Sequence, residues 1–339
     1  MHLPEMNDKG MPELLRFENI AWYEDGAVRI LDRRIYPEIR YEICRTPEEV
    51  ALAIRNMVTQ SGGPLLAVQM GMVLAAKAAA GKPEAEQIKE LEGAAAMLGQ
   101  ARPTTSAALG KLAEKSLQAA KDALSKGTSA VDAVFADALE EANARYARIG
   151  KMAQYLVETF PASGIVMTQC FAETIVGKMC LETRNANKDI RFFCPETRPY
   201  LQGARLTASV ISDLGFPVTV ITDNMPAAIF RNESVDVFTS AADVITGDGH
   251  VINKVGTFQI ALAARWFNVP YYVSGEISRT HATAESVTIE MRDPDDVLRF
   301  RGIRTTKPAV KGLYPAFDVT PPEFVTGIVT ENGIVRPGH

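Results

Sequence analysis

Residues 190–224 have the sequence IRFFCPETRPYLQGARLTASVISDLGFPVTVITDN. The apolar run at 190–194 predicts a buried strand, residues 202–214 have the composition and apolar spacing of a helix, and residues 217–221 form a second β-branched run. A strand, a helix and a strand in this order predict a parallel βαβ unit with a right-handed crossover.

The same alternation extends over most of the C-terminal half. Further strands are predicted at 164–168, 244–246 and 269–273, and helices are predicted after the first two, at 257–266 after the second. We therefore expect residues 151–339 to form a Rossmann-like, doubly wound parallel sheet domain, so that the fold class is α/β. No GxGxxG follows any of these strands, so a dinucleotide site is not supported.

The N-terminal half predicts a different domain. Residues 17–45 contain aromatic and β-branched runs on both sides of Asp25-Gly26, which is a strong hairpin signal. Thr46 can cap a helix that begins at Pro47. Residues 65–148 are rich in Ala, Leu, Glu and Lys, the best helix formers. We expect a β-hairpin followed by a helical domain over residues 1–150.

Composition restricts the classes of function. The 339 residues fit about two domains, and 47% apolar and 23% charged residues are ordinary for a globular protein. The net charge of -5 lacks the basic excess that nucleic-acid binding needs. No secretory signal is evident, and the apolar run at 64–80 is too short to span a membrane. These features predict a cytoplasmic protein without nucleic-acid or membrane partners.

Cysteine and histidine usage argues against disulfides and metal. None of the four cysteines forms a CxxC pair, and two of the four histidines lie at the ends of the sequence. We therefore expect neither a disulfide framework nor a His-rich metal site.

Ligands of open parallel sheets bind beyond the carboxyl ends of the strands, so polar residues there are candidates for chemistry. Cys170 follows the first predicted strand, and a helix after it could lower its pKa and make it a nucleophile or base. A packed core thiol is the alternative. Asp243 stands among apolar residues, where desolvation would raise its pKa and suit a general acid; a helix or turn cap is the alternative.

Two further segments could bind an anion. Arg198, within Glu196-Thr197-Arg198-Pro199, is predicted to form an anion-binding fork next to a helix that begins near Gln202. An internal ion pair between Glu196 and an arginine is the alternative. Asn253-Lys254 could hold a phosphate or a sugar hydroxyl, unless the lysine is simply solvated.

Taken together, the segments resemble the methylthioribose-1-phosphate isomerase family. That family is similar to the regulatory α, β and δ subunits of the translation initiation factor exchange complex and to ribose-1,5-bisphosphate isomerase. The most specific matches contain ETRPYLQGARLT and GHVINKVGT. The others are IAWYEDGAVRILDRRIYPE, EEVALAIRNM, ARPTTSAAL, VTIEMRDPDDV and YPAFDVTPPEFVTGIVTENGIVRP.

The resemblance implies an aldose–ketose isomerisation of a pentose 1-phosphate, through an enediol or a hydride shift. It assigns catalysis to Cys170 and Asp243. It also implies a homodimer, a sugar-phosphate ligand, and no metal or organic cofactor. The residues that it assigns to substrate binding are Ser61, Gly62, Gly63, Arg102, Gln202, Asn253 and Lys254.

The sequence also departs from the family pattern. The family's THCNAG motif is Thr168-Gln169-Cys170-Phe171-Ala172-Glu173 here, so a histidine is lost and a carboxylate is gained. The RGAP turn appears as Ser61-Gly62-Gly63-Pro64, without the arginine that is expected near the phosphate. Arg102, Arg198 or Lys254 would have to compensate. We expect a divergent isomerase for methylthioribose 1-phosphate, 5-deoxyribose 1-phosphate or another pentose phosphate. A non-catalytic sugar-phosphate or nucleotide-binding regulatory subunit is the alternative.

Overall fold

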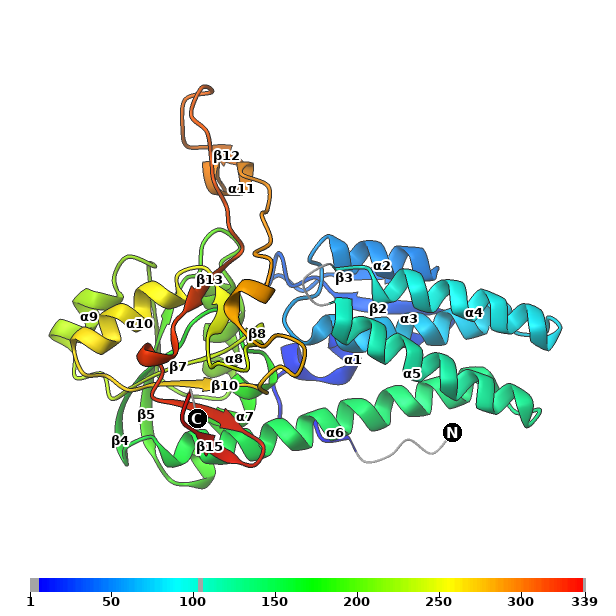
Figure 1. Cartoon of the computed structure of the whole chain (residues 1–339), viewed down its shortest axis with the longest axis horizontal. Helices are drawn as coiled ribbons and strands as arrows, with labels where there is room; N and C mark the ends of the chain where they lie inside the picture. Colours follow the sequence, from blue (N-terminus) through cyan, green and yellow to red (C-terminus); the bar gives the residue numbers. More distant parts are fainter. Residues whose placement is uncertain (1–5, 103–105, 338–339) are drawn as a thin grey trace. The chain divides into compact units, whose positions relative to one another are not determined.

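The computed structural model describes residues 6–102 and 106–337 (Figure 1). The chain divides into two compact units, Met1–Arg148 and Ile149–His339. Each unit is described by itself below.

The first unit begins with short helices and a three-stranded antiparallel sheet, in the order β1-β2-β3. Asp25 and Gly26 connect β1 to β2, and both have positive φ values, 49° and 78°, which are typical of a type I′ turn. The predicted hairpin is confirmed. The elements are η1 (Glu13–Leu15), α1 (Phe17–Ile20), β1 (Trp22–Glu24), β2 (Ala27–Leu31) and β3 (Tyr41–Cys44).

Five helices complete this unit. Thr46 caps α2, because the Glu49 N–H donates a hydrogen bond to its hydroxyl over 3.3 Å, as the sequence predicts. Packing against α2, α4 and α5 buries most of α3. The helices are α2 (Pro47–Arg55), α3 (Gly63–Ala79), α4 (Glu84–Gly99), α5 (Ser106–Ser125) and α6 (Ala130–Glu158), which continues into the second unit.

The second unit contains a seven-stranded sheet in the order β15-β14-β10-β7-β4-β5-β6 (Figure 1). All neighbouring strands are parallel except β14 and β15. The strands are β4 (Ser163–Met167), β5 (Asp189–Pro195), β6 (Val218–Ile221), β7 (Val237–Ala241), β10 (Tyr271–Ser274), β14 (Gly327–Thr330) and β15 (Gly333–Val335). The predicted α/β class with a mostly parallel sheet is confirmed.

Helices cover both faces of this sheet. Phe193 of β5 belongs to a core cluster with residues of α9 and α10, whereas Cys194 faces Cys180 of α7. Successive residues of a strand point to opposite faces, so the strands are apolar on both sides and show no alternation. The helices are α7 (Thr174–Asn185), the π-helix η3 (Gly203–Thr207), α8 (Ala208–Asp213), α9 (Pro226–Asn232) and α10 (Thr257–Trp266).

One predicted strand is misplaced. Residues 244–246 do not form the fourth strand of the large sheet; β7 does, at residues 237–241. The chain leaves the large sheet after Ala241, and β8 (Val244–Ile245) pairs in a small antiparallel sheet of order β13-β9-β8. Its other strands are β9 (Val251–Lys254) and β13 (Phe317–Thr320). Val244 and Ile245 do form a strand, but it belongs to the small antiparallel sheet and not to the large parallel one.

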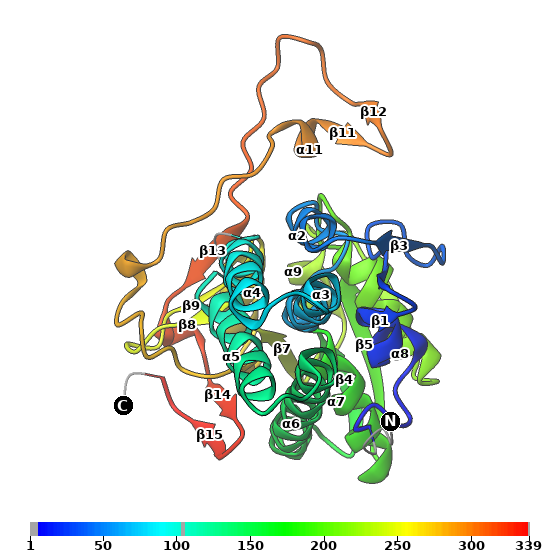
Figure 2. The same ribbon diagram turned by 90° about the vertical axis from the view of Figure 1, so that its right-hand side faces the viewer.

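A long excursion lies between β10 and β13, and its middle part, which includes α11, β11 and β12, extends away from the large sheet (Figure 2). We call residues 276–312 the arm. It contains η4 (Ala284–Ser286), α11 (Asp295–Leu298) and the two-stranded sheet of β11 (Arg299–Phe300) with β12 (Ile303–Arg304). After β13, the 3-10 helix η5 (Pro322–Phe324) leads back to the large sheet.

None of the helices in the described part of the chain is long and apolar enough to span a membrane.

Candidate active site

The strand order of the large sheet reverses between β4 and β7, which pair in parallel through Val166–Val237 and Met167–Phe238. A crevice forms beyond the carboxyl ends of two such strands, because their connections diverge to opposite faces of the sheet. Cys170 follows β4 and Asp243 follows β7. The fold therefore brings the two predicted catalytic residues to the same edge, from neighbouring strands.

Cys170 lies in the turn between β4 and α7, with a positive φ of 57°. Its side chain is half-buried, and its carbonyl oxygen accepts a hydrogen bond from the Thr207 hydroxyl. A hollow of about 10 Å³, large enough for one water molecule, adjoins the thiol. Residues of α6, α7 and β7 line this hollow, together with Gln169 and Thr207.

Burial raises the pKa of the Cys170 thiol to about 11. The positive charge of Lys254 and the Phe171 N–H act in the opposite direction, whereas the charges of Asp243 and Asp223 raise the pKa further. The prediction that a helix N-terminus lowers this pKa is therefore wrong. The helix α7 begins only at Thr174, and the influence of a helix terminus falls off within one turn.

Asp243 lies between the two sheets, and its N–H donates a hydrogen bond to the Ile252 carbonyl over 3.0 Å. Its side chain is exposed, so the predicted apolar setting is wrong in this structure. Ala241 ends β7 and Val244 begins β8, so Asp243 belongs to the surface connection between the sheets rather than to a buried strand. The charge of Asp243 nevertheless acts on the Cys170 thiol, whose pKa it raises.

Lys254, at the end of β9, is buried against aromatic rings. Its Nζ lies 5.0 Å from the ring centre of Phe317 and 5.8 Å from those of Tyr200 and Tyr314. Aromatic faces stabilise an ammonium group, so the rings hold a positive charge close to Cys170. We call these three residues the aromatic cage. The sequence predicted Lys254 but none of the cage residues, which come from two separate segments, at residue 200 and at residues 314–317.

Asn253 precedes Lys254 on the strand, and its side-chain amide donates a hydrogen bond to Thr257 over 3.1 Å. Since consecutive strand residues point to opposite faces, the two side chains leave β9 in different directions. The paired role that the resemblance gives to Asn253 and Lys254 stays a prediction.

Gln202 follows β5 and is buried at the start of η3. Its Oε1 has no hydrogen-bond partner among the described residues, and the same holds for Oε1 of the buried Gln169. Buried amide oxygens without partners are uncommon, and they are available to accept hydrogen bonds from a ligand.

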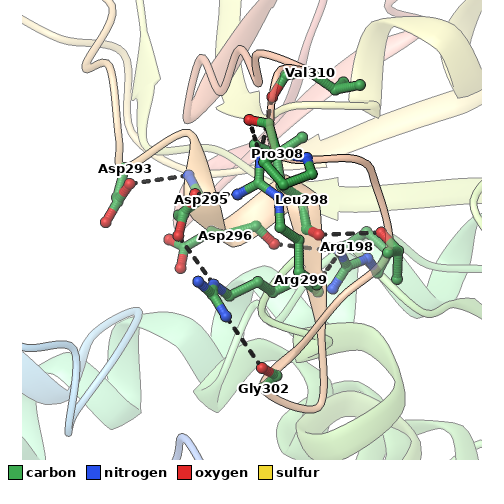
Figure 3. A network of polar contacts seen from close by, with 11 residues as sticks. Arg198, Asp293, Asp295, Asp296, Leu298, Arg299, Gly302, Pro308 and Val310 are labelled. Carbon is green, nitrogen blue, oxygen red and sulfur yellow. Dashed lines mark hydrogen bonds and ion pairs between the residues drawn. The ribbon is translucent and has the colours of Figure 1, made fainter.

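Arg198 does not form the predicted anion-binding fork. Its Nη2 donates to the carbonyl oxygens of Asp296 and Arg299, over 3.3 and 2.9 Å (Figure 3). Its Nη1 donates to the carbonyl oxygen of Pro199 over 3.1 Å. The Asp223 carboxylate accepts hydrogen bonds from the N–H groups of Thr197 and Arg198, and it thereby stabilises the backbone around Arg198. Arg198 therefore anchors the arm, a role that requires contacts distant in sequence.

Four predicted site residues belong to the first unit. Ser61 has a φ of 57° and Gly63 begins α3, while Arg102 is buried, with no partner for its Nε among the described residues. Gly62 lies between the first two. Residues 103–105 of the matched segment ARPTTSAAL lie outside the described part of the chain. The substrate-binding role of these four residues stays a prediction.

Arg33, a buried arginine of the same unit, was not predicted from the sequence. Its Nη1 donates to the Gln60 carbonyl over 2.5 Å, and a Cβ atom on Gly63 would lie 2.7 Å from it. The side chain is buried beside the start of α3, where the motif arginine is missing. No sequence pattern around residue 33 indicates this position.

Among the residues that the structure describes, no cluster of three or more His, Cys, Asp or Glu side chains could hold a metal ion.

Comparison with known proteins gives the family. The model of the Initiation factor 2 subunit family matches residues 59–337. Methylthioribose-1-phosphate isomerase of Chloroflexus aurantiacus is 35% identical, with 94% of this chain and 95% of that protein covered. The 5-deoxyribose 1-phosphate isomerase of Moorella thermoacetica is also 35% identical, with 94% of each covered.

The fold agrees with this relationship. The crystal structure of 5-methylthioribose 1-phosphate isomerase from Pyrococcus horikoshii OT3 superposes with a TM-score of 0.80 at 28% identity, covering 98% of this chain and 97% of that one. This chain therefore belongs to the methylthioribose-1-phosphate isomerase family, within the Initiation factor 2 subunit family.

Proposed function

We propose that this protein is an aldose–ketose isomerase that converts a pentose 1-phosphate to the corresponding ketose 1-phosphate. The substrate is S-methyl-5-thioribose 1-phosphate or a close analogue such as 5-deoxyribose 1-phosphate, in keeping with the names of the relatives. One observation carries the proposal. Cys170 and Asp243 follow neighbouring strands at the reversal of strand order, and the charge of one acts on the pKa of the other.

The two side chains have complementary tasks. Cys170, as thiolate, takes the proton from C2 while the bond between C1 and the ring oxygen breaks and Asp243 gives its proton to that oxygen. The product of this step is an enol phosphate with a double bond between C1 and C2. Cys170 then returns its proton to C1, the 2-hydroxyl proton passes to Asp243, and a ketone remains at C2. Each group ends in its starting state.

Electrostatics determine where the shared proton resides before the reaction. With a pKa of about 11, the sulfur of Cys170 holds a proton at neutral pH in the ligand-free protein. The reactive form has that proton on Asp243. Substrate that covers the exposed carboxylate removes water from it, and desolvation raises the pKa of a carboxyl group. Lys254 favours the same transfer, because its charge lowers the pKa of the thiol.

The substrate lies outside the sheet rather than within it. The hollow beside Cys170 accepts one water molecule and excludes a five-carbon ring. The ring therefore binds beyond the carboxyl ends of β4 and β7, where the unpaired Oε1 atoms of Gln169 and Gln202 can accept hydrogen bonds from sugar hydroxyls. Lys254 supplies a positive charge for the phosphate in this unit. We also propose that Ser61, Gly62, Gly63 and Arg102 bind substrate, as the resemblance implies.

Substitution of the two proposed catalytic residues tests the function. Purified protein is incubated with methylthioribose 1-phosphate, 5-deoxyribose 1-phosphate and ribose 1-phosphate, and ketose formation is followed. Cys170→Ala and Asp243→Asn should each reduce kcat by about 10³-fold or more, because each removes one partner of the proton transfers. Deuterium from solvent water at C1 of the product identifies the enediol route, because the proton on Cys170 can exchange with water, whereas the hydrogen of a hydride shift cannot.

Cys180→Ala is the matched control, because Cys180 is a buried cysteine of α7 that the mechanism does not use. It should lose some stability and keep its turnover. Activity that persists in Cys170→Ala or Asp243→Asn would contradict the assigned roles. If the unmodified protein turns over no aldose 1-phosphate but binds one, the alternative of a non-catalytic regulatory subunit is favoured.

We further propose that the protein is a cytoplasmic homodimer, as the resemblance implies. Large apolar side chains that remain exposed in the single chain, among them Trp266 and Leu313, support a protein interface. Light scattering should give twice the chain mass of 36.9 kDa.

A further inference from the structure

Tyr314 carries a buried hydroxyl group that has no hydrogen-bond partner among the described residues. The side chain is 2% exposed. Two other buried tyrosines behave differently: the Tyr146 hydroxyl donates to the Leu15 carbonyl over 2.7 Å, and that of Tyr271 is 2.6 Å from the Ser240 hydroxyl. A buried polar group without a partner costs about 1–3 kcal/mol, so the Tyr314 hydroxyl needs an explanation.

The surroundings of Tyr314 place it at the site of Cys170. Its ring belongs to the aromatic cage of Lys254, and it makes an edge contact with Tyr200 at 5.9 Å between ring centres. The charge of Cys170 acts on the pKa of the phenol. The chain holds Tyr314 firmly, because the Arg292 N–H donates to its carbonyl oxygen over 2.9 Å.

The protonation state of the phenol is fixed. Burial raises the pKa of Tyr314 above its usual value, and the charges of Tyr200 and Cys170 raise it further, whereas that of Arg292 lowers it. The hydroxyl therefore keeps its proton throughout the working pH range. It can donate a hydrogen bond, but it does not take part in proton transfer.

We propose that the Tyr314 hydroxyl is a catalytic hydrogen-bond donor, which contacts the substrate oxygen on C2 beside Cys170. This inference rests on the proposed isomerase function. Negative charge develops on this oxygen in the second step, when the 2-hydroxyl proton passes to Asp243 and the ketone forms, and a donor that is already in place stabilises such charge without rearrangement. The missing partner of the hydroxyl is then the substrate. In the free protein the unpaired Tyr314 hydroxyl lowers the free energy of unfolding. The protein retains it because the reaction requires the donor.

Removal of the single oxygen atom tests the inference. Tyr314→Phe keeps the ring in the cage of Lys254, so the fold should be unaffected. We expect kcat to fall by about 10²-fold with little change in KM, because the hydrogen bond strengthens in the transition state. The melting temperature should stay equal or rise, since the variant no longer buries an unpaired hydroxyl.

Tyr146→Phe is the matched control, with the same substitution at a buried tyrosine of the first unit. It removes a hydrogen bond that is present in the free protein, so its melting temperature should fall while turnover stays unchanged. If Tyr314→Phe instead loses stability and keeps its activity, the hydroxyl has a structural partner and the inference is overturned.

The outcome can be separated from a failure of the proposed function. Full activity in Tyr314→Phe would overturn the inference alone, because the unmodified protein would still be an isomerase. If the unmodified protein turns over none of the three sugar phosphates, the isomerase proposal fails. The catalytic role of Tyr314 then fails with it, whereas a reduced kcat in Tyr314→Phe beside an active unmodified protein supports both proposals.

Discussion

Asp318 illustrates how one carboxyl group connects stability to pH. It accepts the N–H groups of Gly256, over 2.7 Å, and of Phe258 at the start of α10. Burial nevertheless raises its pKa to about 6, although those N–H groups and the charge of Lys254 lower it. Desolvation thus outweighs the capping interactions at this position.

The folded protein binds the proton of Asp318 more tightly than the unfolded chain, whose aspartates have a pKa of about 3.9. The unfolding free energy should therefore fall as pH rises from about 4 to 6, with a contribution of about 3 kcal/mol from Asp318. Asp318→Asn, which keeps a carbonyl oxygen for the Gly256 N–H, should flatten this dependence in denaturant titrations at several pH values.

Asp132→Asn, at an exposed aspartate of α6, should leave the pH dependence as it is in the unmodified protein. If Asp318→Asn shows the same loss of stability between pH 4 and 6 as the unmodified protein, another group is responsible.

At the scale of elements, the connection from β5 to α8 positions Gln202. Gly203 begins η3 at a point where the helix approaches the end of β5, and a Cβ atom there would overlap the carbonyl oxygen of Pro195. Only glycine allows this approach, which brings the following turn against the sheet edge. Thr207, at the end of η3, then reaches the carbonyl oxygen of Cys170.

Gly203→Ala should therefore destabilise the protein by about 3 kcal/mol, because backbone atoms must move to admit a methyl group. Urea titration measures this loss. Gly93→Ala is the control: Gly93 is exposed on α4, and a methyl group added there would meet open space, so alanine should stabilise the protein by about 0.5–1 kcal/mol. Similar effects at both positions would show that space at Gly203 is not limiting.

At the scale of the whole molecule, α6 begins in the first compact unit and ends in the second. Helix formation is cooperative, so a helix that runs through the boundary couples the unfolding of its two ends. We expect one calorimetric transition for the full chain. Gly150 lies on this helix just beyond the boundary, with open space around its Cα.

Gly150→Pro should reduce the melting temperature and separate the unfolding into two transitions, because proline removes a helical hydrogen bond and clashes with the preceding turn. Gly150→Ala should keep one transition and raise the melting temperature slightly. Differential scanning calorimetry of both variants checks this. Two transitions in the unmodified protein would contradict the coupling.

The sequence by itself determined the local structure and the positions of the catalytic candidates along the chain. The Asp25-Gly26 turn and the Thr46 cap follow from the preferences of a few adjacent residues, and so do the strand–helix–strand units. Family motifs located Cys170 and Asp243, and the parallel sheet brings them to one edge because carboxyl ends of parallel strands coincide.

Only the tertiary structure decided what surrounds those residues. The exposure of Asp243, the raised pKa of Cys170 and the direction of Arg198 all depend on segments far away in the sequence. The same is true of Tyr314, whose unpaired hydroxyl no local pattern indicates. Turn and helix preferences act over a few residues, whereas desolvation and charge act through space, so the chemistry of the site becomes readable only after folding.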